Sequence, residues 1–202
     1  LLAVMPQLKG NAEGTFLAVI DLDMGRGTLT IGISVDFSIK PLLEIQIPVE
    51  AFFNFNQSKD WHLYLGRYVD RIHAKILEVF EGSGYVMLSG KGFVAGDLNP
   101  DLPVPIQGFA ISAGLHVSFV WGSKSIGLYA EVAAGFDAVI GFDPFLVAGI
   151  LYVRGTLHLF IIDISAWANL NVTIGELPNG TRVSRIEGEI CGRIEFLFFD
   201  IE

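Results

Sequence analysis

The sequence has 202 residues, of which 51% are hydrophobic and 17% are charged. This much apolar surface offsets the entropy lost when the chain becomes ordered, so the composition excludes a disordered protein. The formal net charge of −9, with no cluster of basic residues, argues against nucleic acid as a partner. Cys191 is the single cysteine, which excludes an internal disulfide or a thiolate metal cluster.

Alternating apolar and polar residues predict β-strands from the N-terminal part of the chain onward. Between Leu29 and Ile39 every second residue is apolar, and Thr, Gly, Ser and Asp fill the places between. The run from Leu43 to Val49 repeats the pattern after a break at Pro41. These two runs are expected to form neighbouring antiparallel strands, each with one face buried.

The segment from Arg67 to Phe80 fits two interpretations. Its apolar residues fall near a 3.6-residue period, with charged residues opposite, which indicates a short helix. Two short strands are the alternative.

Further alternating runs follow along the chain and bring the total to roughly a dozen strands. They lie at 16–23, 61–65, 85–89, 106–113, 115–121, 126–134, 146–154, 156–164, 166–174 and 184–199. The fold class is therefore all-β, with mostly antiparallel strands in a strongly curved, stacked or elongated sheet array with hairpin repeats.

The part of the chain from Gly127 to Ile164 is the most apolar. Leu157, Leu159 and Ile161 are expected on one side of a strand and Phe160 and Ile162 on the other, which predicts strands covered on both faces. Residues 1–202 then form a single β-rich segment, with sub-units at 1–100 (amphipathic strands) and 101–202 (strands apolar on both sides). The chain begins without Met and ends directly after a strand-like run, so we expect a segment of a larger protein.

An internal similarity with an offset of 37 residues links 153–164 to 190–201. Gly155 matches Gly192, and Asp163 matches Asp200. The similarity favours a repeated hairpin, with the two Asp residues in equivalent places. Chance similarity between β-rich segments is the alternative.

Carboxylates in one turn suggest a cation site. Asp97, Asn99 and Asp101 have the one-residue spacing with which calcium loops begin, although the later Gly and Glu of an EF-hand are missing. Turn chemistry is the alternative, because Asp and Asn favour turns.

No spacing of residues predicts an enzyme. The four His residues do not have metal-ligand spacing, and no nucleophile motif is present. If catalysis did occur, His62 and the Asp97–Asp101 turn would be the residues to inspect.

A resemblance adds one expectation. Trp61–Gly66, Gly84–Gly90, Gly108–Phe119 and Ala134–Ile140 resemble a recurring block of very large, repetitive, β-rich bacterial surface proteins of the TANFOR type. The resemblance implies a scaffold segment in the cell envelope or outside the cell, and it brings no assigned activity.

The first hypothesis for function is a non-enzymatic structural or interaction module, a β scaffold that contacts other segments of the same large protein or subunits of its assembly. A module that binds lipid or another apolar ligand in a hydrophobic groove is the alternative. An outer-membrane β-barrel is a third hypothesis, against which the apolar residues on both sides of the central strands argue.

Overall fold

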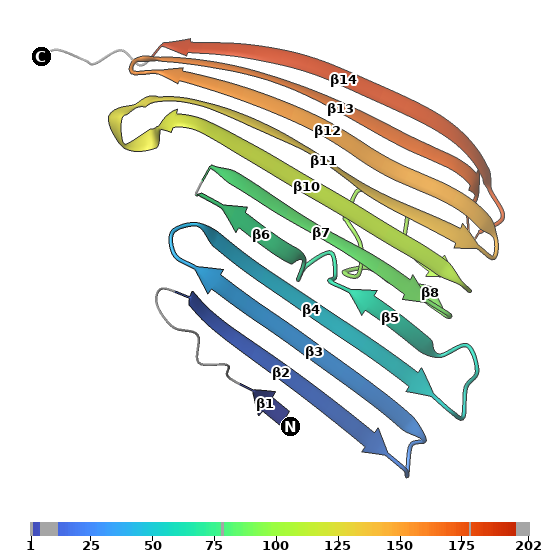
Figure 1. Ribbon diagram of the computed structural model, residues 1–202. Helices are drawn as coiled ribbons and strands as arrows, with labels where there is room; N and C mark the ends of the chain where they lie inside the picture. Colours follow the sequence, from blue (N-terminus) through green and yellow to red (C-terminus); the bar gives the residue numbers. More distant parts are fainter. Residues whose placement is uncertain (1, 5–11, 78, 178, 197–202) are drawn as a thin grey trace, which may run out of the picture.

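A computed structural model describes residues 2–4, 12–77, 79–177 and 179–196. Twelve strands form one large sheet, and nearly all of them follow one another in chain order across it (Figure 1). The all-β prediction is confirmed, and the sheet is extended rather than stacked. The strands of this sheet are β1 (Leu2–Val4), β2 (Ala12–Asp23), β3 (Thr28–Ile39), β4 (Leu43–Asn54), β5 (Trp61–Leu65), β6 (Ile72–Ile76), β7 (Phe80–Ser89), β10 (Ala110–Ser123), β11 (Leu128–Phe142), β12 (Phe145–Leu159), β13 (Ile162–Glu176) and β14 (Arg182–Phe196).

Short turns join most neighbouring strands, so every pairing in the large sheet is antiparallel. In the turn from β2 to β3, Oδ1 of Asp23 accepts hydrogen bonds from the backbone N–H groups of Gly25 and Arg26, both at 2.9 Å. Gly27 closes this turn with φ of 66°, a conformation that costs glycine little. The η1 turn (Lys124–Ile126) joins β10 to β11. No helix within the described ranges is long and apolar enough to cross a membrane.

The described residues between Arg67 and Phe80 contain strand and turn, so the helical interpretation is wrong. The alternative of two short strands is right about the type of structure, but one strand and the first residue of the next are found. β6 occupies residues 72–76, and β7 begins at Phe80. β5 and β6 both lie between β4 and β7 and pair with each of them. Ile72 and Ile76 are four residues apart, a spacing that suits one face of a strand as well as one face of a helix.

The sheet has two faces of opposite character. Successive side chains along each strand point to opposite faces of the sheet. The pairing registers place apolar residues of one strand opposite apolar residues of the next, so these residues share one face. We call the side that bears Leu29, Ile45, Val86, Leu115 and Leu151 the apolar face. The opposite side, which bears Asp36, Glu50, Tyr85, His116 and Asn169, is the polar face. The apolar face consists, strand by strand, of alternate residues of 12–22, 29–39, 43–53, 61–65, 72–76, 80–88, 111–121, 128–142, 145–159, 162–176 and 182–196.

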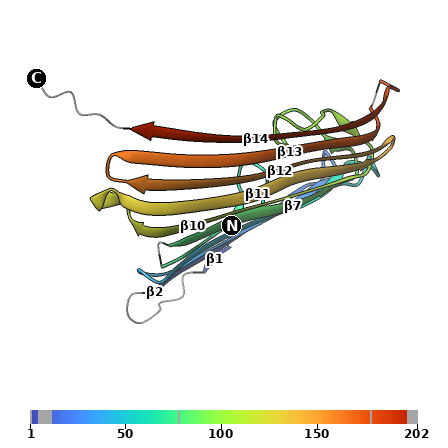
Figure 2. The same cartoon turned by 90° about the horizontal axis from the view of Figure 1, so that it is seen from above.

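One segment covers part of the polar face. Residues 90–109, which we call the strap, connect β7 to β10 and contain a small hairpin of β8 (Gly92–Phe93) and β9 (Ile106–Gln107). The strap stands off one side of the sheet (Figure 2). The buried core lies between the strap and the sheet, with residues from both, and comprises Tyr64, Tyr85, Met87, Phe93, Leu98, Leu102, Ile106, Ala110, Val139, Leu146 and Ala148. The core therefore occupies the polar face, and the apolar face carries no covering layer within the described part of the chain.

The expectation that residues 127–164 are apolar on both faces is not met. Leu157 and Leu159 belong to the apolar face, but His158 between them belongs to the polar face. Phe160 and Ile161 form the hairpin turn between β12 and β13, where Phe160 has φ of 54° and Ile161 is 48% exposed. The four consecutive apolar residues 159–162 thus span a turn. The sequence pattern therefore suggested strands apolar on both sides, although each strand is apolar on one side only.

The segments with the 37-residue similarity lie on either side of β13. Val153 in β12 and Ile190 in β14 are both opposite Ala168. Asp163 lies at the start of β13, and Asp200 is outside the described residues. The sheet also continues across the expected division at residue 100, because β7 pairs with β10.

Candidate functional site: the two faces of the sheet

The apolar face exposes many large hydrophobic side chains. Large side chains on it are open to solvent, including Ile20 (69%), Val132 (53%) and Leu151 (48%). Ten strand positions at about 4.8 Å spacing give it a width of about 45 Å. Among the described residues, charge enters these rows only at Glu176 and Arg182, beside the turn that joins β13 to β14. Soluble monomers rarely expose an apolar patch of more than a few hundred Å².

Aromatic side chains gather near one end of the strands on this face. Trp61 stacks on Phe109 with ring centroids 6.1 Å apart, and Phe109 stacks on Phe142 at 5.2 Å. Phe145 meets Phe142 edge to face at 6.4 Å. These residues come from the β4–β5 hairpin, the end of the strap and the β11–β12 hairpin, so the cluster follows the rim of the sheet.

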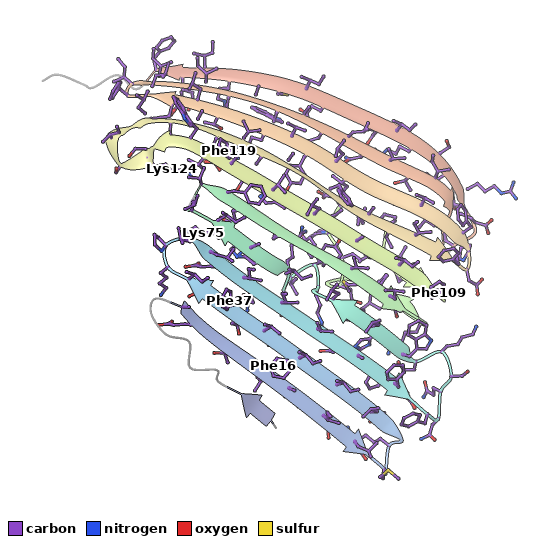
Figure 3. The ribbon with its side chains drawn as sticks, in the orientation of Figure 1. Phe16, Phe37, Lys75, Phe109, Phe119 and Lys124 are labelled. Carbon is purple, nitrogen blue, oxygen red and sulfur yellow. The ribbon has the colours of Figure 1, made fainter. Side chains whose placement is uncertain are left out.

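Aromatic residues also lie near the other end of the strands. Phe119 and Trp121 close β10 and are 48% and 69% exposed, and Phe80 begins β7 beside them. Phe109 and Phe119 lie near opposite ends of β10 in Figure 3. The apolar face therefore carries aromatic rings near both ends of the strands, and Phe136 lies among the aliphatic residues between them.

The polar face holds a buried ion pair next to the strap. Nη2 of Arg71 donates to Oδ1 of Asp137 at 2.7 Å, and Nδ2 of Asn99 donates to Oδ2 of the same carboxylate at 3.0 Å. The guanidinium of Arg71 also lies 5.2 Å from the ring of Tyr68 and 4.9 Å from that of Tyr85. This cluster ties the β5–β6 connection, the strap and β11 together.

Small residues of β10 leave room for the cluster. A Cβ atom on Gly114 would lie 2.2 Å from Oδ1 of Asp137 and 2.4 Å from a ring carbon of Tyr85. Oγ of Ser112 donates to the carbonyl oxygen of Ala138 at 2.9 Å. Both carboxylate oxygens of Asp137 accept a hydrogen bond, one from Arg71 and one from Asn99. The cluster therefore holds the strap against the sheet.

The predicted calcium residues all lie in the strap. Oδ2 of Asp97 accepts a hydrogen bond from the N–H of Val94 at 2.9 Å, and Oδ1 of Asn99 accepts one from the N–H of Asp101 at 3.1 Å. The second bond is that of an Asx turn, and the first joins Asp97 to the backbone at the start of its own turn. No group of three or more His, Cys, Asp and Glu side chains in the described ranges could hold a metal ion. Calcium binding by Asp97, Asn99 and Asp101 stays a prediction.

His62 lies on β5 and contacts Glu50 of β4. Its Nε2 is 2.7 Å from Oε1 of Glu50, and its ring stacks on Tyr64 with centroids 4.2 Å apart. Arg67 contacts the same carboxylate. The structure thus places His62 in an ion-pair cluster of the sheet, whereas Asn99 is joined to Asp137.

The carboxylate of Asp163 contacts Nδ1 of His158 across the β12–β13 hairpin. A shallow depression of about 560 Å³ lies along the same polar face. Its lining includes Glu81, His116, Tyr129, Glu131, Tyr152 and Arg154. This surface carries acidic and basic side chains that can form hydrogen bonds with water or with a polar ligand.

Two charged groups outside the strands have shifted pKa values. Hydrogen bonds from Lys91 and Asn54 lower the pKa of Asp60 in the turn before β5. The hydrogen bond from Lys124 to Glu131, at 2.7 Å, raises the pKa of Lys124.

The fold and its two faces define an all-β protein with one amphipathic sheet. No protein-family model matches the chain, and comparison with curated proteins and with solved structures finds no match either. The resemblance to TANFOR-type proteins stays a prediction.

Sequence reasoning missed the Arg71–Asp137 pair, although one signal was available. Asp137 is the single charged residue between Ala133 and Phe142, within a strand. A lone carboxylate in such a run requires a buried partner, because an unpaired buried charge is costly. The partner could not be named, because Arg71 is 66 residues away in the chain.

Proposed function

We propose that the chain is a membrane-embedded β-sheet segment without enzymatic activity, whose apolar face contacts the acyl chains of a lipid bilayer. The observation that carries this proposal is the exposed apolar face itself, which runs across every long strand. Burying such a surface against acyl chains is favourable, at roughly 25 cal/mol per Å² of apolar area. The polar face then meets water or polar protein groups.

The dimensions of the sheet support the proposal. A strand that crosses a bilayer at a tilt needs about 9–11 residues. β2, β3 and β4 have 12 residues each, and β11 to β14 have 15 each. Strands of this length can reach across the hydrocarbon core and end in the headgroup region.

The aromatic rings support it too. Membrane proteins concentrate Trp and other aromatic residues at the two membrane–water interfaces. Here Trp61 and Phe109 lie at one end of the strands, and Phe119 and Trp121 lie at the other. The charged pair Glu176 and Arg182 also lies at a strand end, where it would meet headgroups rather than acyl chains.

A β scaffold in a larger envelope assembly is the second candidate. The outer edge of β14 favours it, because no described strand pairs there and another segment or subunit could add one. In this case the apolar face would pack against protein. Both candidates place the chain in the cell envelope.

Quenching of tryptophan fluorescence by brominated lipids tests the first proposal. Trp121 lies on the apolar face and Trp167 on the polar face. We compare Trp61→Phe/Trp167→Phe, which retains Trp121, with Trp61→Phe/Trp121→Phe, which retains Trp167, both in vesicles with brominated acyl chains. Trp121 should be strongly quenched and Trp167 only weakly.

A third variant tests depth within the bilayer. Leu170 lies at the middle of β13 on the apolar face, so a tryptophan introduced by Leu170→Trp, with the native three replaced by Phe, should be quenched best by bromine near the acyl-chain ends. Trp121 should respond best to bromine near the headgroups. Equal quenching of Trp121 and Trp167, or failure of the protein to float with vesicles in a density gradient, would overturn the proposal.

A further inference from the structure

The outer edge of β14 is the longest edge of the sheet. β14 pairs with β13 over its whole length, and no described strand pairs with its other side. Ile186, Ile190 and Ile194 are 67%, 86% and 61% exposed. In β12, which has neighbours on both sides, Val153 and Leu157 occupy the places that match Ile190 and Ile194 and are only 46% and 37% exposed. The larger exposed fractions of Ile190 and Ile194 reflect the absence of a described neighbouring strand on the outer side of β14.

The backbone of β14 is open to the addition of a strand. Natural edges are protected by proline, by bulges, by short strands or by charged side chains. The charged side chains of β14 that lie on the polar face have both signs, so a strand of complementary charge can pair beside them. β14 has 15 residues, contains no proline and keeps a continuous register with β13. Its backbone can therefore accept a further antiparallel strand.

The sequence of β14 is complementary to itself about Ile190. Four pairs of residues at equal distances on the two sides of Ile190 match: Gly188 with Gly192, Ile186 with Ile194, Glu187 with Arg193, and Arg185 with Glu195. Next to Ile190 itself, Glu189 falls opposite Cys191. The Ile pairs lie on the apolar face and the charged pairs on the polar face. The charged side chains are 52–67% exposed, so they are free to reach a partner strand.

We propose that two copies of the chain associate through β14, edge to edge and antiparallel, with Ile190 of one copy opposite Ile190 of the other. Glu187 then faces Arg193 of the second copy and Arg185 faces Glu195, and the two-fold symmetry forms each pair twice. Arg185 already contacts Glu187 within the strand at 2.7 Å, and Arg193 contacts Glu195 at 3.2 Å. Each of these four charged residues therefore has an opposite charge both within its own strand and across the new strand pair.

Other registers are less favourable. A shift that centres the pair on Cys191 places Glu187 opposite Glu195, and one that centres it on Glu189 places Arg185 opposite Arg193. Like charges directly opposite are destabilising. A symmetric pair must be centred on a residue or between two residues. Centring between two neighbours would place the apolar face of one copy beside the polar face of the other.

This inference goes beyond the proposed contact with lipid and does not depend on it. A strand edge can pair in water as well as in a bilayer, and in a bilayer an unpaired edge is especially costly.

Disulfide formation tests the register. In the Ile190→Cys/Cys191→Ser variant the two introduced thiols face each other across the two-fold axis. Antiparallel partners have Cα atoms about 4.5–5.5 Å apart, which is within the range of a disulfide. Oxidation of the full chain in vesicles and in detergent should yield a covalent dimer.

Two matched controls place a thiol on the same face. Ile186→Cys/Cys191→Ser and Ile194→Cys/Cys191→Ser should not dimerise alone, since like residues would be eight positions, or about 27 Å, apart along the strands. A mixture of the two should form the cross-linked dimer. The proposal is overturned if the Ile190→Cys variant stays monomeric, or if the Ile186→Cys variant cross-links with itself as well as the Ile190→Cys variant does.

Charge reversal gives an independent readout. Glu187→Arg should weaken the dimer about tenfold in sedimentation experiments, because it places Arg opposite Arg193 twice. The double variant Glu187→Arg/Arg193→Glu restores opposite charges and should restore association. Equal association of the single variant and the parent would count against the pairing, and so would a double variant as weak as the single one.

Discussion

Arg71 and Asp137 form a buried ion pair on the polar face, although 66 residues separate them in the sequence. Their side chains are 18% and 6% exposed, and Nη2 of Arg71 lies 2.7 Å from Oδ1 of Asp137. The pair joins the connection between β5 and β6 to β11, on the side of the sheet that the strap covers. The pair therefore holds these two segments together on the polar face.

Removing one member of this pair should be strongly destabilising. We expect Arg71→Met to lower the free energy of unfolding by about 3–5 kcal/mol, because Asp137 would keep a buried charge without its cation. The control is Arg26→Met, which breaks the exposed pair with Asp23 and should cost less than about 1 kcal/mol. Denaturant unfolding in detergent measures both. Similar losses in the two variants would show that the buried pair has no special role.

A methyl group at Gly114 should disturb the same cluster. The Cβ atom of Gly114→Ala would lie 2.2 Å from Oδ1 of Asp137, so the strands or the carboxylate must move. Overpacking of this kind costs about 1–3 kcal/mol. Gly155→Ala is the matched control, because a Cβ atom there would meet nothing within 4 Å. Thermal unfolding should separate the two variants, and a Gly114→Ala protein as stable as the Gly155→Ala protein would contradict the packing described.

The strap should be released when its main apolar contact is removed. Phe93 is 1% exposed and lies in the core, with its ring 6.5 Å from that of Tyr64. We expect Phe93→Ala to cost about 3–5 kcal/mol and to speed proteolytic cleavage between residues 90 and 109. Val94→Ala, at a neighbouring position that is 62% exposed, should leave cleavage unchanged. If both variants were cleaved at the same rate, the strap would not be held by its core contacts.

The turn before β5 should contribute a component of stability that depends on pH. Nζ of Lys91 donates to Oδ1 of Asp60 at 2.5 Å, and this bond lowers the pKa of Asp60 in the folded protein. A carboxyl group with a lowered pKa stabilises the fold above its pKa in the unfolded chain, about 3.9, and this stability is lost as the pH falls through the folded-state pKa.

Lys91→Gln should therefore lower the free energy of unfolding near neutral pH. It should also move the acid limb, the low-pH range over which stability is lost, closer to the range expected for an aspartate with an ordinary pKa. Lys59→Gln removes the same charge from the same turn and should leave the acid limb in place, since Lys59 forms no ion pair with a described residue. Melting temperatures measured between pH 2 and pH 7 provide the comparison. Acid limbs that coincide in the two variants would contradict the assigned bond.

Much of the fold was predictable because alternation is a local property. The runs at 29–39 and 43–49 became β3 and β4, and Pro41 lies in the turn between them. The helical interpretation of 67–80 failed because Ile72 and Ile76 satisfy both periods, and pairing with β4 and β7 decided in favour of a strand. The prediction of strands that are apolar on both sides was wrong because Phe160 and Ile161 belong to a turn.

Alternation in the sequence is enough to establish a β-protein with one apolar and one polar row along most strands. That the apolar rows of the described strands share one uncovered face is visible only in the folded arrangement, and so is the strap on the opposite face, held there by the hydrogen bond between Asn99 and Asp137. The position of β14 at the edge of the sheet is likewise visible only there. The physical reason is that alternation depends on neighbours two residues apart, whereas the position of a strand within the sheet, and the face that another segment covers, depend on contacts between residues far apart in the chain.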